Sequence, residues 1–278
     1  AQPDAAALPT LTSELMTLVA AQKDQEEFDR ALTHCQTDEG SRDAALRARA
    51  LQGLIEGINR AGAGKLRITT PLIELTQSAE AEVRRRARQL GGMLAWPASQ
   101  KGATLLTTHD AIAADTNAVL AERISAVRLL RAAPATETAD LFRKLLRHDS
   151  PPELQKSVID ALVQTGRAVA GDILLDISTW NQYTPDIRGH VIEGVTSRTA
   201  LIAPLLSYIE AGEIAASTLS AEQVRRLTEH KDKTIAGRAQ KVLNAPTDAD
   251  RKAVLDRYME ALTLTGDTKN GRDVFRAN

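Results

Sequence analysis

The sequence predicts an all-α fold, an α-solenoid in which antiparallel helix pairs stack into a right-handed superhelix. Aromatic residues supply only 3% of the 278 residues, fewer than sheet-rich folds usually contain. The chain is rich in Ala, Leu, Arg, Glu and Gln, which favour helices. A motif also returns along the chain at the interval of one helix pair, which indicates a repeat array with one continuous core.

The recurring motif has the form apolar-Arg-x-x-Ala-x-x-apolar, with a small residue at its centre. That central residue returns after 37, 39, 32, 33 and 48 residues, close to the roughly 33–47 residues of helix-pair repeats. The six central residues are Ala50, Ala87, Ala126, Val158, Val191 and Ala239. Because repeats keep equivalent positions in equivalent surroundings, we expect this column to be buried where neighbouring helix pairs meet.

The predicted elements begin with a leading helix near residues 10–22. Helix pairs follow, and in each pair the second helix carries the motif. The pairs are 24–36 with 41–60, 65–77 with 79–95, 100–114 with 118–132, 136–148 with 151–165, and 168–180 with 184–197. The longest step, before Ala239, predicts an irregular last unit with helices near 199–211, 221–230 and 233–244.

Capping residues predict where several of these helices begin and end. Ser150 is expected to be an N-cap with Pro151 in the first turn, where a missing N–H costs nothing. Thr184, followed by Pro185, has the same arrangement one repeat later. Further candidates are Ser41 and Ser78 as N-caps, Ser220-Ala221-Glu222-Gln223 as a capping box, and Gly62-Ala63-Gly64 and Gly91-Gly92 as turns or a helix end.

Two stretches give the array a family resemblance. Residues 81–87, Ala-Glu-Val-Arg-Arg-Arg-Ala, and residues 230–239, His-Lys-Asp-Lys-Thr-Ile-Ala-Gly-Arg-Ala, resemble the consensus of HEAT repeats, which are close in architecture to armadillo repeats. The resemblance implies a HEAT-like α-solenoid over residues 1–245, with the second helices lining a concave side that serves protein–protein interaction.

The C-terminal end carries a different resemblance, after a connecting helix expected at residues 246–265. The pattern Gly-Asp-x-x-x-Gly-Arg-x-Val-Phe, from Gly266 to Phe275, resembles the opening helix of a c-type cytochrome domain, just before its CxxCH motif. HEAT repeats followed by such a domain occur in haem-binding proteins of the Pirellula/Verrucomicrobium type, relatives of membrane-bound dehydrogenases. The resemblance implies that residues 266–278 are the stub of a cytochrome c-like domain, in a piece of a periplasmic or exported redox protein.

The residue types predict no cofactor, metal or catalytic residue in this piece, and haem c is expected in the missing downstream domain. The one cysteine, Cys35, is not part of a CxxCH motif and cannot attach haem c there. Cys35 and its neighbour His34 diverge by about 100° on a helix and so do not form a nucleophile and base, and Cys35 is expected to be a buried apolar residue. The five histidines form no metal-binding motif, and His148 and His230 are expected to hydrogen-bond the last carbonyls of first helices.

Charge gives the chain no general attraction to nucleic acid or anionic lipid, because its formal net charge is -1. No apolar run is long enough to predict membrane insertion. The candidate interaction residues are Arg84, Arg85 and Arg88, which point around much of one helix, so partner contacts are favoured over a phosphate site. The motif arginines Arg47, Arg84, Arg123 and Arg188 form either an anion-binding ladder or, as we favour, a ladder that ties repeats together.

The sequence therefore predicts a scaffold or protein-interaction module, not an enzyme, that positions a downstream haem c domain. Its partner would be another protein or the chain's own neighbouring domains. The alternative is a HEAT-like DNA glycosylase or another nucleic-acid-binding solenoid, which would need a basic groove with an Asp and aromatic residues around an extruded base. The near-neutral charge and the scarcity of aromatics argue against that alternative.

Overall fold

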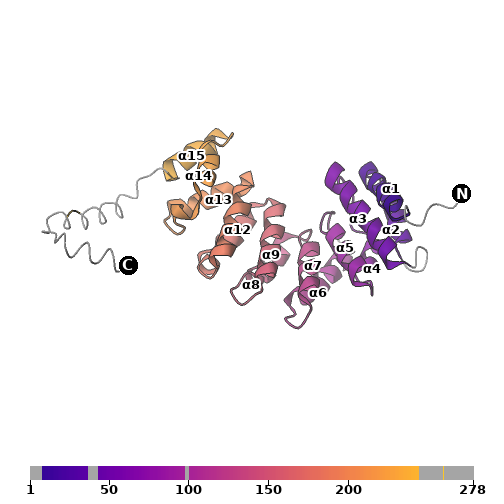
Figure 1. The fold of residues 1–278 in the computed structure, drawn as a ribbon. Helices are drawn as coiled ribbons and strands as arrows, with labels where there is room; N and C mark the ends of the chain where they lie inside the picture. The colour runs from indigo at the N-terminus through magenta and orange to yellow at the C-terminus, as the bar shows by residue number, and fades with distance from the viewer. Residues whose placement is uncertain (1–7, 37–42, 98–99, 244–258, 260–278) are drawn as a thin grey trace, which may run out of the picture. The chain divides into compact units, whose positions relative to one another are not determined.

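The computed structural model describes residues 8–36, 43–97 and 100–243, together with Met259, and its regular elements within this part of the chain are helices (Figure 1). It contains fifteen α-helices and one short 3₁₀ helix, which confirms the all-α prediction. The chain divides into two compact units, one ending at Gln223 and the other beginning at Val224. The expected connecting helix at 246–265, apart from Met259, and the stub at 266–278 lie outside the described residues.

The helices of the first unit follow the predicted pairs. They are α1 (Leu8–Gln22), α2 (Gln25–His34), α3 (Ala44–Ala61), α4 (Thr70–Leu75), α5 (Ala81–Gly91), α6 (Gln100–Ala114), α7 (Leu120–Leu130), α8 (Ala135–Leu145), α9 (Pro152–Thr165), α10 (Ala168–Leu174), α11 (Ile177–Trp180), α12 (Pro185–Thr196), α13 (Thr199–Glu210) and the 3₁₀ helix η1 (Ala216–Thr218). Helix α14 (Ala221–Thr228) runs into the second unit, which contains α15 (Lys233–Leu243).

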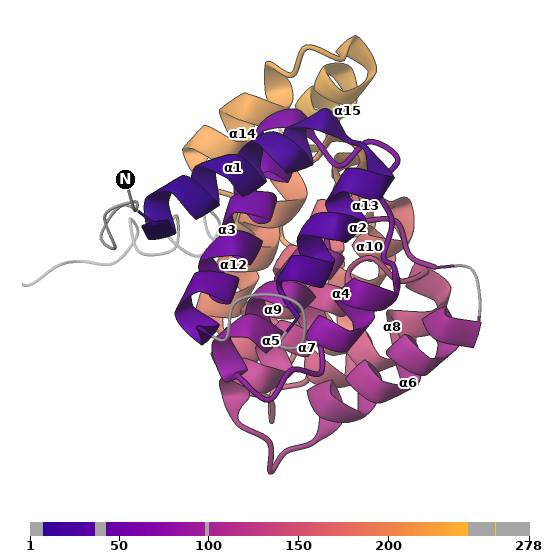
Figure 2. The ribbon, with the colours of Figure 1, turned by 90° about the vertical axis from the view of Figure 1, so that its right-hand side faces the viewer.

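The helices of the first unit lie in two rows. The motif helices α3, α5, α7, α9 and α12 contact one another in that order, and α1 joins this row by packing on α3. In the other row α2 contacts α4, and α6, α8, α10 and α13 contact one another in succession. Figure 2 shows α3 and α12 on one side and α6 and α8 on the other. This is the solenoid-like arrangement that the repeat period predicts.

Among the helices of the described residues, none combines the length and the apolar character that a membrane span requires.

The largest departure from the predicted elements is the helix expected at 65–77, which shrinks to α4. Pro71 lies in the first turn of α4, where its missing N–H costs no helix hydrogen bond, whereas in the middle of a helix from 65 to 77 it would break one. The preceding segment is extended instead: Ile68 N donates to Ala95 O at 3.1 Å, and Ala95 N donates to Leu66 O at 3.1 Å. Because residue 95 takes part in this bridge, α5 ends at Gly91 and not at 95 as expected.

The helix expected at 168–180 is divided into α10 and α11. The carboxylate of Asp176 accepts hydrogen bonds from Ser178 N at 3.1 Å and Thr179 N at 3.2 Å. This is the geometry of an N-cap, so Asp176 begins a new helix within the predicted one.

The predicted caps are confirmed in part. Thr184 accepts from Ile187 N at 3.4 Å, and Ser220 and Gln223 exchange the two hydrogen bonds of a capping box, at 2.9 and 3.2 Å. The prediction for Ser78 is wrong, because Glu80 is the N-cap of α5 and the Ser78 hydroxyl donates to its carboxylate. The prediction for Ser150 is wrong by one residue, because Pro151 is the N-cap and Pro152 the first helical residue. Ser41 lies outside the described residues.

The burial predicted for the small central column is confirmed. All six of its members are buried, and these are Ala50, Ala87, Ala126, Val158, Val191 and Ala239. The motif register deduced from the sequence is therefore the register of the fold.

The contact between α1 and α3 is unusually close because glycines of α3 face the backbone of α1. A Cβ atom at Gly53 would lie 2.3 Å from Ser13 O, and one at Gly57 would lie 2.4 Å from Thr17 O. The Thr17 hydroxyl also donates to Gly53 O at 3.2 Å. The two helices therefore meet backbone to backbone, which a side chain at either glycine would prevent.

We expect Gly57→Ala to lower the free energy of unfolding by roughly 1 kcal/mol, because overpacking at the α1 contact exceeds the helix propensity that alanine adds. Amide exchange should localise the change to α1. The matched control is Gly189→Ala in α12, where an added Cβ meets no atom within 4 Å and the propensity gain should stabilise the protein. Urea melts of both variants measure this; equal gains in stability would contradict the close contact.

Candidate partner-binding groove

Two of the motif arginines tie the end of a first helix to the motif helix that follows it. Arg123 Nε donates to Ala113 O at 3.0 Å, and Arg188 Nε donates to Trp180 O at 3.3 Å. Where Gln155 replaces arginine, its amide donates to Leu146 O at 3.0 Å and Arg147 O at 2.6 Å. Glutamine therefore preserves the same helix-end contact.

The first two arginines of the column reach a carboxylate of the next repeat. Arg47 is buried, and its Nη2 lies 2.9 Å from Glu80 Oε1. Arg84 forms a fork on Glu122, with Nε 2.9 Å from Oε2 and Nη2 3.0 Å from Oε1. A ladder between repeats is therefore confirmed for Arg47 and Arg84, whereas Arg123 and Arg188 bind a helix end within their own pair.

The candidate interaction residues Arg84, Arg85 and Arg88 do not share one site. Arg88 is buried, and its Nη1 donates to Glu122 Oε2 at 2.6 Å, so Arg84 and Arg88 converge on the same carboxylate. The hydrogen bond from Arg84, followed by the charge of Arg88, holds the pKa of Glu122 below its ordinary value. Arg85 instead pairs with Glu82 on its own helix at 2.6 Å. Of the three, only Arg85 lies outside the Glu122 cluster, and a partner contact there stays a prediction.

The predicted roles of two histidines are wrong. His148 Nδ1 lies 3.3 Å from Gln182 Oε1, because Gln155 already donates to the last carbonyls of α8. His230 Nδ1 accepts from Asp232 N at 3.1 Å and so cannot donate to a carbonyl through that atom.

Cys35 is buried as expected, and burial raises the pKa of its thiol to about 12. Its neighbour His34 is exposed, so the two side chains do not form a nucleophile and base. Among the described residues, no group of three or more His, Cys, Asp or Glu side chains is placed to hold a metal ion.

His109 is a buried titratable group that the sequence did not single out. Its Nδ1 lies 2.9 Å from Leu105 O, and within the described part of the chain Nε2 has no hydrogen-bond partner. Burial lowers the pKa of His109 from its ordinary value of 6.5 to about 4. The folded protein therefore holds this imidazole neutral across the mildly acidic range.

Stability is expected to fall as the pH drops below 6.5. In this range the unfolded chain binds a proton at His109 that the folded chain does not bind, down to about pH 4. At pH 5.5 the loss should be roughly 1 kcal/mol relative to pH 7. Urea melts at both pH values measure it, and His109→Gln should flatten the dependence; an unchanged slope in that variant would rule out His109 as the cause.

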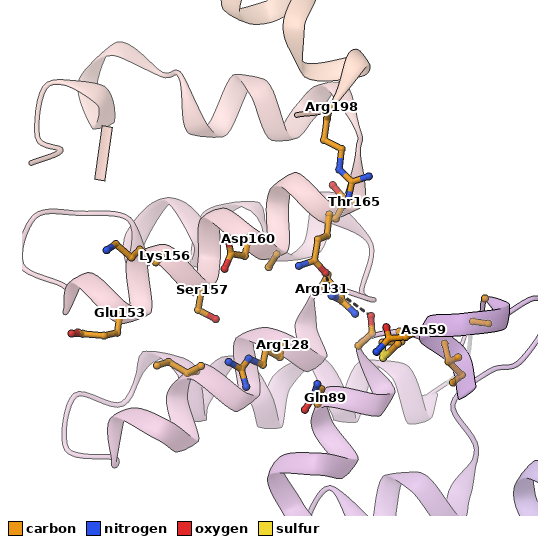
Figure 3. Close-up of a pocket in the computed structure, with 18 residues that line it drawn as sticks. Asn59, Gln89, Arg128, Arg131, Glu153, Lys156, Ser157, Asp160, Thr165 and Arg198 are labelled. Carbon is orange, nitrogen blue, oxygen red and sulfur yellow. Dashed lines mark hydrogen bonds between the residues drawn. The ribbon is translucent and has the colours of Figure 1, made fainter. Parts of the chain in front are cut away.

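A groove of about 1070 Å³ lies along the motif helices of the first unit (Figure 3). It crosses α3, α5, α7 and α9 and reaches the segment after α12. Its lining residues are Ile58, Asn59, Gly62, Ala63, Gln89, Gly92, Met93, Ile124, Arg128, Arg131, Glu153, Lys156, Ser157, Asp160, Ala161, Gln164, Thr165 and Arg198. The helices that line it are therefore motif helices, the second helices of the predicted pairs.

Acidic and basic side chains both contact the N-terminal half of α9 at the groove. Lys156 Nζ lies 2.8 Å from Asp186 Oδ2, and the charge of Glu153 also raises the pKa of Lys156. Asp160 Oδ1 lies 2.8 Å from His190 Nε2. The N-terminal half of α9 therefore brings both acidic and basic side chains to the groove.

Arg131 is held rigidly at the other edge of the groove. Its Nε donates to Gly92 O at 2.9 Å, and its Nη1 donates to Gln164 Oε1. Burial, and then the charge of Arg128, lower the pKa of Arg131. The two guanidinium groups are therefore close enough to repel each other.

The groove residues were missed by the sequence analysis, although a positional signal exists. The residue two positions after the small central residue lines the groove in three successive repeats, and these residues are Gln89, Arg128 and Asp160. Reading that column beside the motif column would have found them.

Comparisons with known proteins identify no family. No protein-family profile matches the chain, and no curated protein matches it. Among solved structures, a crystal structure of an engineered protein from the Northeast Structural Genomics Consortium aligns with 17% identity and a TM-score of 0.36, covering 88% of this chain and 71% of that one. The function therefore has to be inferred from the chain's own residues.

Proposed function

We propose that this chain is a non-catalytic scaffold that binds a protein partner or a neighbouring domain through the groove of its motif helices. The observation that carries this proposal is the groove itself, which spans successive repeats linked by side chains such as Arg84 and Arg88, both of which bind Glu122 of the next repeat. Side chains on rigid, cross-linked helices are well placed to present a fixed surface to a partner.

We further propose that the bound neighbour is a haem c domain encoded downstream, in a periplasmic or exported redox protein. The support is the likeness of Gly266–Phe275 to the start of a cytochrome c-like domain. The chain itself cannot attach haem covalently, because its one cysteine, Cys35, is buried and is not part of a CxxCH motif. Haem would therefore belong to the domain and not to the array.

The coding sequence after Asn278 and a binding assay test the two parts of this proposal separately. A CxxCH motif is expected within a few residues of Asn278, and its absence would remove the haem domain while leaving the scaffold. If the motif is present, the purified haem domain should co-elute with residues 1–278 in size-exclusion chromatography, followed by haem absorbance. An unrelated c-type cytochrome is the control, and separate elution of both cytochromes would contradict docking.

The alternative, a HEAT-like DNA glycosylase or another nucleic-acid-binding solenoid, finds less support in the groove. Asp160 is engaged by His190, and the lining contains no aromatic side chain to stack on an extruded base. Salt-sensitive binding of duplex DNA would favour this alternative.

A further inference from the structure

Three arginines follow one another along the edge of the groove where the motif helices end. Arg128 lies in the last turn of α7, Arg131 is the C-cap of α7, and Arg198 follows α12. Figure 3 shows them in this order, with Thr165 between Arg131 and Arg198. The three guanidinium groups come from two repeats but line one groove.

These arginines lack carboxylate partners within the described residues. Arg131 is anchored by a carbonyl and an amide oxygen, at Gly92 and Gln164, and neither oxygen carries a charge. No ion pair is formed by Arg128 or Arg198 within the described part of the chain, and both side chains are exposed. This contrasts with Arg84 and Arg88, whose charges meet Glu122. The edge of the groove therefore keeps positive charge that no described group neutralises.

We propose that this edge binds a short acidic peptide segment of the partner, whose carboxylates pair with Arg128, Arg131 and Arg198. The inference rests on the proposed scaffold function and names the chemistry of the partner. Guanidinium groups bind carboxylates as a two-pronged fork, and Arg131 is already fixed in place by its anchors. The volume of about 1070 Å³ exceeds most single-ligand pockets, so a short extended segment has room.

The groove favours a peptide over a nucleic acid because the lining arginines without a carboxylate partner lie along one edge, whereas Lys156 is paired with Asp186. Glu153 and Asp160 line the same groove, and a continuous phosphate backbone that follows the groove would pass these carboxylates. A peptide can place Glu or Asp opposite the arginines and neutral residues elsewhere. The hydroxyl of Ser157, which also lines the groove, could donate to a peptide carbonyl.

The test uses the full chain and a fluorescein-labelled (Glu-Ser)₄ peptide, followed by fluorescence anisotropy at about 50 mM NaCl, where screening is modest. Arg128→Glu and Arg198→Glu should each weaken binding by about tenfold, because reversing a charge replaces attraction by repulsion. The matched control is Arg143→Glu on α8, an exposed arginine outside the groove, which should change binding by less than about twofold. A (Gln-Ser)₄ peptide should not bind.

Several results would overturn the inference. The first is an equal loss of peptide affinity in Arg128→Glu, Arg198→Glu and Arg143→Glu. The second is failure of the acidic peptide to bind, or binding of the glutamine peptide with equal affinity. The third is tighter binding of a single DNA strand of eight thymidines that depends on the same arginines. If Arg128→Glu unfolds, Arg128→Gln replaces it, with melts as the check. Loss of peptide binding alongside intact haem-domain docking would refute only the acidic-peptide inference, and the reverse pattern would refute only the haem-domain partner.

Discussion

Glu122→Ala is expected to lower the free energy of unfolding by about 3 kcal/mol, because it strands a buried positive charge. Arg88 has its Nη1 2.6 Å from Glu122 Oε2 and a side chain that is 4% exposed, and Arg84 lies on the same carboxylate. Without Glu122, the Arg88 guanidinium would keep only neutral acceptors such as Ser125 Oγ and Thr76 O. The two arginines would also repel each other. Urea melts give the size of the loss.

The matched control for Glu122→Ala is Glu82→Ala in α5. Glu82 also pairs with two arginines, Arg85 and Arg86, but its side chain is 46% exposed, so its loss should cost less than about 1 kcal/mol. In an Arg88→Met background, Glu122→Ala should cost much less than it does in the wild type, because the buried charge is gone. Equal losses for Glu122→Ala and Glu82→Ala would show that the cluster does not hold the repeats together.

Ala126→Leu is expected to destabilise the protein by about 2 to 3 kcal/mol, at the upper end of the range for overpacking a filled core. Ala126 is completely buried in α7, whose neighbours in the row are α5 and α9. The control is Ala121→Leu on the same helix, where the side chain is exposed and the change should be nearly neutral. Denaturant melts measure the free energy of unfolding of both variants. Equal values for Ala126→Leu and Ala121→Leu would mean that Ala126 does not face the interface.

The damage from Ala126→Leu should spread through nearest neighbours. In a repeat array each unit contacts only the adjacent units, so amide exchange should accelerate in α5 and α9 more than in α1 or α13. Uniform acceleration along the first unit would show that the array unfolds as one cooperative block.

The sequence predicted the register of this fold because register depends on a local pattern that repeats. Burial of a small residue such as Ala87 follows from its place in the motif. Helix ends were less predictable, since they depend on competition among nearby groups. Ser78 is a good N-cap type, yet Glu80 takes the position. The extended pairing of Ile68 with Ala95 depends on a contact across 27 residues, which periodicity does not report.

The site was less predictable than the fold because the partner of a long charged side chain depends on which helix packs beside it. The sequence indicated a dense arginine run but not that Glu122, on the next motif helix, would meet Arg84 and Arg88. The histidine predictions failed for a related reason. The carbonyls expected for His148 are taken by Gln155, and in the last unit Gln240 donates to Thr228 O at 3.0 Å.

The helix-end hydrogen bonds also bear on how the array can change in length. Gln155 and its acceptors, Leu146 and Arg147, belong to one helix pair, and Arg123 and Ala113 belong to another. Donor and acceptor would therefore be duplicated or deleted together. A gene rearrangement that adds or removes a whole helix pair would leave no such carbonyl without its donor, whereas one that cuts between the two helices of a pair would separate donor from acceptor.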